Sequence, residues 1–175
     1  MELKNSKTAK NIMTALSAEC MAKVKYDFYA ERAHGDGYEE IAEVFNLTSD
    51  NEFAHAKVLF RMFVGKGSDT LANLKDASKG ENFEGSEMYP TFAEVAEDEG
   101  FTDIANTFRL LANIEIAHRQ RYDALASNIE KGTVFEKPEE VEWLCLNCGH
   151  TQKGTSAPQK CPTCNHPQSY FKVKN

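Results

Sequence analysis

The sequence predicts a mainly α protein, in which a four-helix bundle precedes a small, loop-rich, metal-binding module with short β strands. Three observations predict this fold. Residues 8–131 are rich in helix-forming residues and poor in proline, and glycines divide them into long segments. Proline and glycine become frequent after Gly132. Four of the five cysteines form two Cys-x-x-Cys pairs near the C-terminal end of the sequence.

Four helices are expected, at residues 8–34, 38–64, 69–99 and 102–131, with breaks at 35–37, at 65–69 and near Gly100. Each helix spans about 40 Å at 1.5 Å per residue. Long helices joined by short connections favour an antiparallel bundle. The third helix carries Gly80, Gly85 and Pro90, which predict a kink or a late start.

Each predicted helix places acidic residues or histidines in the middle of its apolar face. An unpaired carboxylate in a bundle core costs several kcal/mol, and the same faces carry no lysine or arginine that would neutralise them. Two divalent cations would neutralise most of this negative charge. Carboxylate and imidazole donors favour iron or manganese. The residues concerned are Glu19, Glu52, His55, Glu81, Glu84, Glu115 and His118.

Two of the helices contain the motif Glu-x-x-His, at Glu52–His55 and Glu115–His118. This spacing directs a carboxylate and an imidazole to the same side of a helix, as in di-iron carboxylate proteins. Glu94 and Glu97 are alternatives to Glu81 and Glu84 on the third helix, but they belong to an acidic run typical of a solvated surface. We therefore choose Glu81 and Glu84.

Tyr26 lies on the same face of the first helix as Glu19. It fits two interpretations, a core aromatic residue and a phenol that donates a hydrogen bond to a ligand carboxylate.

The C-terminal module is too small to fold on an apolar core alone, so its cysteines are expected to bind a metal ion. We expect a reducing compartment, in which Cys145, Cys148, Cys161 and Cys164 are metal ligands rather than disulfides. Iron and zinc both fit this spacing.

Charge and hydropathy exclude two classes of partner. The chain has 27 acidic and 20 basic residues, which argues against nucleic acid as the main partner. Its apolar runs are too short to span a membrane. The first ten residues lack the apolar segment of a secretory signal, so a cytoplasmic location is expected.

The order of these motifs resembles the rubrerythrin family over nearly the whole chain, most closely at Gly80–Glu84 and at Glu87–Pro90. The resemblance implies a ferritin-like di-iron domain at residues 1–135 and a rubredoxin-like domain at residues 136–175. It implies three iron ions per chain. Two would be held by Glu19, Glu52, Glu81, Glu84, Glu115 and His118, with His55 exchanging with Glu84 as one iron changes oxidation state, and the third by the four cysteines. Asn165 replaces the glycine usual after the second cysteine pair, and we expect it to tolerate a left-handed backbone.

The resemblance further implies an enzyme that reduces hydrogen peroxide to water and protects against oxidative stress, and Tyr26 is a candidate proton donor. The sequence has no dinucleotide-binding glycine fingerprint, so electrons are expected from a separate NAD(P)H-dependent donor protein or a rubredoxin. A head-to-tail homodimer is expected, and helix exchange between subunits is an option. The alternative functions are ferritin-type iron storage or ferroxidase activity, and reduction of dioxygen.

Overall fold

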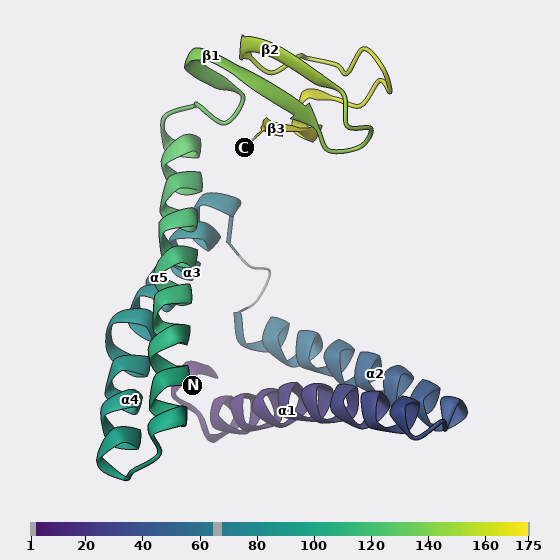
Figure 1. Ribbon diagram of the computed structural model, residues 1–175, viewed down its shortest axis with the longest axis vertical. Helices are drawn as coiled ribbons and strands as arrows, with labels where there is room; N and C mark the ends of the chain where they lie inside the picture. The colour runs from purple at the N-terminus through teal and green to yellow at the C-terminus, as the bar shows by residue number, and fades with distance from the viewer. Residues whose placement is uncertain (1–2, 65–67, 175) are drawn as a thin grey trace. The chain divides into compact units, whose positions relative to one another are not determined.

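A computed structural model describes residues 3–64 and 68–174 of the chain, which divides into two units, residues 1–67 and 68–175 (Figure 1). Each unit is described by itself. The described helices include none that is long and apolar enough to cross a membrane.

The first unit is a pair of long antiparallel helices, α1 (Lys7–Gly35) and α2 (Glu39–Val64), preceded by the short turn η1 (Leu3–Asn5). Ser6 caps α1 by accepting a hydrogen bond from the backbone N–H of Ala9. The two helices pack through small residues, because Ala42, Ser49 and Ala56 recur every seven positions on α2 and all are buried.

The second unit begins with three helical segments, α3 (Thr70–Phe83), α4 (Tyr89–Asp98) and α5 (Thr102–Glu130). Between α3 and α4 lies η2 (Glu84–Met88), one π-helical turn. Both α3 and α4 pack against α5. Gly85 allows the backbone of η2 to lie close to α5, since a Cβ atom at this position would be 2.9 Å from the Ala112 carbonyl oxygen.

The third predicted helix therefore starts where expected but contains an irregularity. The wide turn η2 ends two residues before Pro90, whose ring does not fit against the carbonyl four residues earlier in a regular α-helix. The other three helix predictions are confirmed to within one residue at each end. Residues 65–67 of the predicted second break lie outside the described residues.

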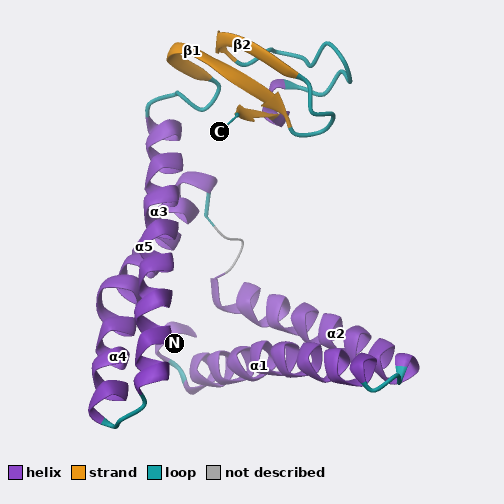
Figure 2. Cartoon of the chain, in the orientation of Figure 1, coloured by secondary structure: helices purple, strands orange, loops and turns teal. Residues whose placement is uncertain are grey.

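The C-terminal module, also in the second unit, is a three-stranded antiparallel sheet with strand order β2-β1-β3 (Figure 2). Its elements are β1 (Glu136–Cys145), β2 (Thr151–Ser156), η3 (Gln168–Tyr170) and β3 (Phe171–Val173). A register shift between Glu136 and Val141 accommodates Pro138. The sequence does not predict β2, because most of its residues are polar and it forms by pairing with β1.

The core of this module is very small. It consists of Trp143, Cys145, Ala157, Cys161 and Phe171, so two of its five buried residues are predicted metal ligands. The indole N–H of Trp143 donates to the Gly154 carbonyl, 3.0 Å away. The predicted fold class, a mainly α chain followed by a small module with short strands, is confirmed.

Candidate metal centres

The first unit brings together Glu19 of α1 with Glu52 and His55 of α2, which we call the first half-site. One potential ligand atom from each residue lies within 4.8 Å of the others. His55 Nδ1 is 2.8 Å from Glu52 Oε2 and 3.9 Å from Glu19 Oε2. The Glu-x-x-His spacing sets the contact within α2, and the antiparallel packing of the helices adds Glu19.

The second unit brings together Glu81 of α3 with Glu115 and His118 of α5, which we call the second half-site. Its three ligand atoms also lie within 4.8 Å of one another. His118 Nδ1 is 2.7 Å from Glu115 Oε2 and 3.5 Å from Glu81 Oε2. Each half-site thus offers two carboxylates and one imidazole nitrogen, and in both the histidine turns Nδ1 toward the carboxylates.

Electrostatics within the second half-site suit a cation. Burial raises the pKa of Glu81, and the nearby Glu115 carboxylate raises it further, while His118 acts in the opposite direction. A divalent ion between these oxygens would stabilise both carboxylates in their ionised form. Oxygen and imidazole donors at this spacing fit iron, so the residues present are suited to the group that the sequence predicts.

The other residues considered for the site are not among the clustered ligands of the two half-sites. Glu84 is half-buried at the start of η2 and is not among the three clustered ligands of the second half-site. Tyr26 stacks on Phe45, with the ring centroids 6.1 Å apart. Glu97, one of the alternatives on the third segment, pairs with Arg109 at 3.0 Å.

The four tail cysteines form the third candidate centre. The Sγ atoms of Cys145 and Cys164 are 3.7 Å apart, as are those of Cys148 and Cys161. A disulfide needs about 2.05 Å. Four sulfur atoms placed about 2.3 Å from a common ion in a tetrahedron lie about 3.8 Å apart, so the observed spacing is that of a four-thiolate metal site.

Two matching turns hold these cysteines. The Cys145 N–H donates to the His150 carbonyl and the Gly149 N–H to the Cys145 carbonyl. In the second turn, the Cys161 N–H donates to the His166 carbonyl at 2.8 Å, and the Asn165 N–H donates to the Cys161 carbonyl. Asn165 takes the left-handed conformation (φ 62°) that Gly149 takes in the first turn (φ 77°), as the sequence predicts.

Thiolate formation is favoured at one position of this cluster. The backbone N–H of His166 is the main cause that lowers the pKa of Cys164 to about 5. At Cys148 the backbone N–H of His150 also acts to lower the pKa, but the neighbouring thiols and burial outweigh it and raise the pKa to about 12. A bound cation would favour the thiolate form at all four positions.

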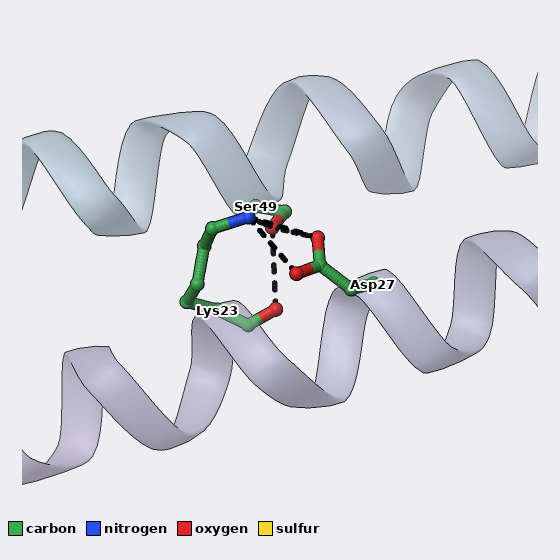
Figure 3. A network of polar contacts seen from close by, with 3 residues as sticks. All are labelled: Lys23, Asp27 and Ser49. Carbon is green, nitrogen blue, oxygen red and sulfur yellow. Dashed lines mark hydrogen bonds and ion pairs between the residues drawn. The ribbon is translucent and has the colours of Figure 1, made fainter. Parts of the chain in front are cut away.

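Sequence reasoning missed a polar cluster between α1 and α2 that consists of Lys23, Asp27 and Ser49 (Figure 3). The only local signal was the spacing of four residues between Lys23 and Asp27, which is common on exposed helix faces. The participation of Ser49 depends on how the two helices are aligned, and no pattern within either helix reveals it.

Comparisons with known proteins found matches to both the helical part and the tail of the chain. Residues 10–126 match the family described as rubrerythrin, and residues 143–172 match the rubrerythrin rubredoxin-like domain. A rubrerythrin of Clostridium perfringens is 43% identical, over 98% of this chain and 96% of its own length. One from Nitratidesulfovibrio vulgaris is 39% identical over the same shares. A structure described as the partially reduced state of nigerythrin is 29% identical, over 97% of this chain and 90% of that chain, with a TM-score of 0.37.

Proposed function

The chain belongs to the rubrerythrin family, and on that premise we propose that it reduces hydrogen peroxide to water at a non-haem di-iron centre. The observation that carries the proposal is the presence, in one chain, of two Glu, Glu, His half-sites and a four-cysteine site. The half-sites suit a pair of ions that act together, and the cysteines suit an ion that transfers single electrons. We propose that residues 1–135 form the domain that holds the iron pair, and that residues 136–175 form the domain that transfers electrons.

The proposed ligands of the iron pair come from both half-sites. Glu84 completes the set, one helical turn after Glu81 on the same segment. His55 and Glu84 are the two groups proposed to exchange as one iron changes oxidation state. Glutamate suits this role because its carboxylate can bind through one oxygen or two without movement of the backbone.

When bound, the iron pair would supply the two electrons and the Lewis acidity that break the O–O bond of peroxide. The balance of the reaction, H₂O₂ with two electrons and two protons giving two waters, leaves proton delivery to the chain. Tyr26 is the proposed donor of one proton through its hydroxyl group. The stacking of its ring on Phe45 limits the positions that the hydroxyl can take.

Electrons are proposed to enter at the tail module, because the thiolate site suits one-electron transfer and the sequence lacks a dinucleotide fingerprint. The source is a separate protein, either an NAD(P)H-dependent donor or a rubredoxin. A head-to-tail homodimer would let the tail of one copy serve the iron pair of the other.

Stopped-flow mixing tests the proposal. The fully reduced, iron-loaded protein is mixed with hydrogen peroxide or with dioxygen, and oxidation of the tail centre is followed by its ferric thiolate absorption. Peroxide is expected to oxidise the protein faster than dioxygen does. Faster oxidation by dioxygen would indicate an oxygen reductase, and a large multi-subunit shell in gel filtration would favour iron storage.

A further inference from the structure

The polar cluster of Lys23, Asp27 and Ser49 is here called the first polar cluster (Figure 3). Lys23 follows Glu19 by one helical turn on α1, and Ser49 precedes Glu52 by one turn on α2. Lys23 Nζ donates to both carboxylate oxygens of Asp27, at 3.0 and 2.9 Å, and to Ser49 Oγ at 3.0 Å. Ser49 is completely buried, and its hydroxyl donates to Asp27 Oδ1 at 2.5 Å. The cluster thus ties two residues of α1 to one residue of α2.

A second polar cluster joins α3 to α5 in the other unit. The Ser78 hydroxyl of α3 donates to Asp123 Oδ1 of α5 at 2.5 Å. Arg119 Nη1 of α5 donates to Asn82 Oδ1 of α3 at 2.9 Å, and its Nε lies 4.0 Å from Asp123 Oδ2. As in the first cluster, a serine on one helix contacts an aspartate on the antiparallel partner, and a cation lies four residues before that aspartate.

Both clusters have the same position relative to the metal-binding residues. Glu19 precedes Lys23 by four residues and Asp27 by eight, and Glu115 precedes Arg119 and Asp123 by the same intervals. On the partner helices, each serine comes three residues before a half-site glutamate. These pairs are Ser49 with Glu52, and Ser78 with Glu81. The same contact therefore recurs one turn from each half-site.

The buried part of the surrounding interfaces consists largely of small side chains. Buried alanines dominate them, including Ala42 and Ala56 of α2 and Ala105 and Ala112 of α5. Alanine packing provides few directional contacts, whereas a hydrogen bond between side chains of two helices forms in one register only, and at Ser49 this contact is buried. The ionised carboxylates of a half-site lie within 4.8 Å of one another, so their mutual repulsion opposes this register in the absence of a cation.

We propose that the two polar clusters are positioning elements, which hold each helix pair in the register that keeps its half-site ligands at metal-binding distance before metal arrives. The cluster residues are not ligands. They act through the helices that carry the glutamates and histidines, much as hydrogen-bonded neighbours orient ligands in other metal sites. The inference rests on the proposed function only in that the half-sites bind metal.

Anaerobic titration of the metal-free, full-length protein with Co²⁺ alone tests the proposal. Cobalt at the four cysteines gives intense thiolate charge-transfer absorption, whereas carboxylate and histidine sites give weaker visible bands, so both affinities come from one titration. Ser49→Ala removes the hydroxyl with little change in volume. It is expected to weaken Co²⁺ binding at the half-sites about tenfold, the lower end of the usual effect of such neighbours, with no change at the cysteines.

Two further variants serve as controls. Ser17→Ala removes a hydroxyl of α1 that donates to the Met13 carbonyl of its own helix, at 3.0 Å, so it should leave both affinities unchanged. Ser49→Thr keeps a hydroxyl and should recover most of the lost affinity. A purely structural effect of Ser49→Ala would lower thermal stability without changing the cobalt bands well below the unfolding temperature.

The proposal is overturned if Ser49→Ala keeps its helix content and binds Co²⁺ at the half-sites as tightly as the unmodified protein. If Ser49→Ala loses helix content, Ser78→Ala decides the question from the second polar cluster, with the same tenfold weakening expected. Absence of half-site Co²⁺ binding in the unmodified protein would instead contradict the proposed metal centre, and thus separates the two claims.

Discussion

Glu81 shows how the surroundings of a single side chain distinguish a ligand from an ordinary acidic residue. Its carboxylate lies 3.5 Å from His118 Nδ1, and burial next to Glu115 raises its pKa. Glu94, on the following helix, is exposed. Glu81 and Glu94 each begin a Glu-x-x-Glu motif. In the sequence, only their positions relative to the apolar face of the predicted helix distinguish them.

Replacement of these two glutamates gives a direct comparison. Glu81→Ala is expected to lower iron binding at the carboxylate centre at least tenfold, because it removes one of the three donors of the second half-site. Glu94→Ala should bind iron normally. Iron content after anaerobic reconstitution and desalting measures both, and equal iron loss in the two variants would refute the choice of Glu81.

Asp27 provides a pH-dependent prediction. Hydrogen bonds from Ser49 and then from Lys23 hold the pKa of Asp27 below its ordinary value of 3.8. Because the pKa is lower in the folded state, this carboxylate stabilises the fold above about pH 3.8, and the contribution disappears as pH falls through the folded pKa. Carbon-13 NMR titration should show the pKa rising toward 3.8 in Ser49→Ala, and an unchanged value would mean that the hydroxyl does not bond Asp27 in solution.

Contacts within one helix could be predicted from the sequence, but contacts between helices could not. Glu52 and His55 meet because three residues separate them on α2, and the motif predicts this. Ser49 meets Asp27 because of the alignment of α2 on α1, which sequence periodicity does not determine. The same holds for Ser78 and Asp123, which are far apart in the sequence.

At the scale of elements, the irregular third segment was predicted only in outline. Gly80, Gly85 and Pro90 indicated a disturbance, and the structure locates it in η2. The two glycines differ in their roles. Gly85 lies against the backbone of α5, whereas the space around Gly80 is open to 4 Å. Composition alone treats them as equivalent.

Alanine at each glycine tests this distinction. Gly85→Ala is expected to destabilise the protein by about 1–3 kcal/mol, because the new methyl group would overlap the Ala112 carbonyl. Gly80→Ala should instead stabilise it by up to about 1 kcal/mol, since alanine favours a helix. Urea unfolding followed by circular dichroism measures both, and a neutral Gly85→Ala would show that η2 does not pack closely on α5.

The tail module is expected to depend on its metal ion more than on its five-residue core. Trp143 is the only tryptophan of the chain and is completely buried, so its fluorescence reports on this module alone. Chelation of the metal under reducing conditions should shift Trp143 emission to longer wavelength while the helical circular dichroism persists. Unshifted emission from the metal-free protein would mean that the strands fold without the four thiolates.

At the scale of the whole molecule, each unit carries one of the two half-sites. Glu19, Glu52 and His55 belong to the first unit, and Glu81, Glu115 and His118 to the second. Each unit also exposes large apolar side chains on its helices, including Phe28 and Leu47 in the first and Leu110 in the second. Neither helix pair alone makes a complete core, which agrees with the four-helix bundle of the family.

The iron content of the whole chain tests the central claim most directly. After anaerobic reconstitution with ferrous iron, the proposed scheme predicts three iron ions per chain and, on oxidation, the visible absorption of a ferric four-thiolate site. A chain that holds one iron at the cysteines and none at the carboxylates would contradict the claim that these acidic side chains form an iron centre.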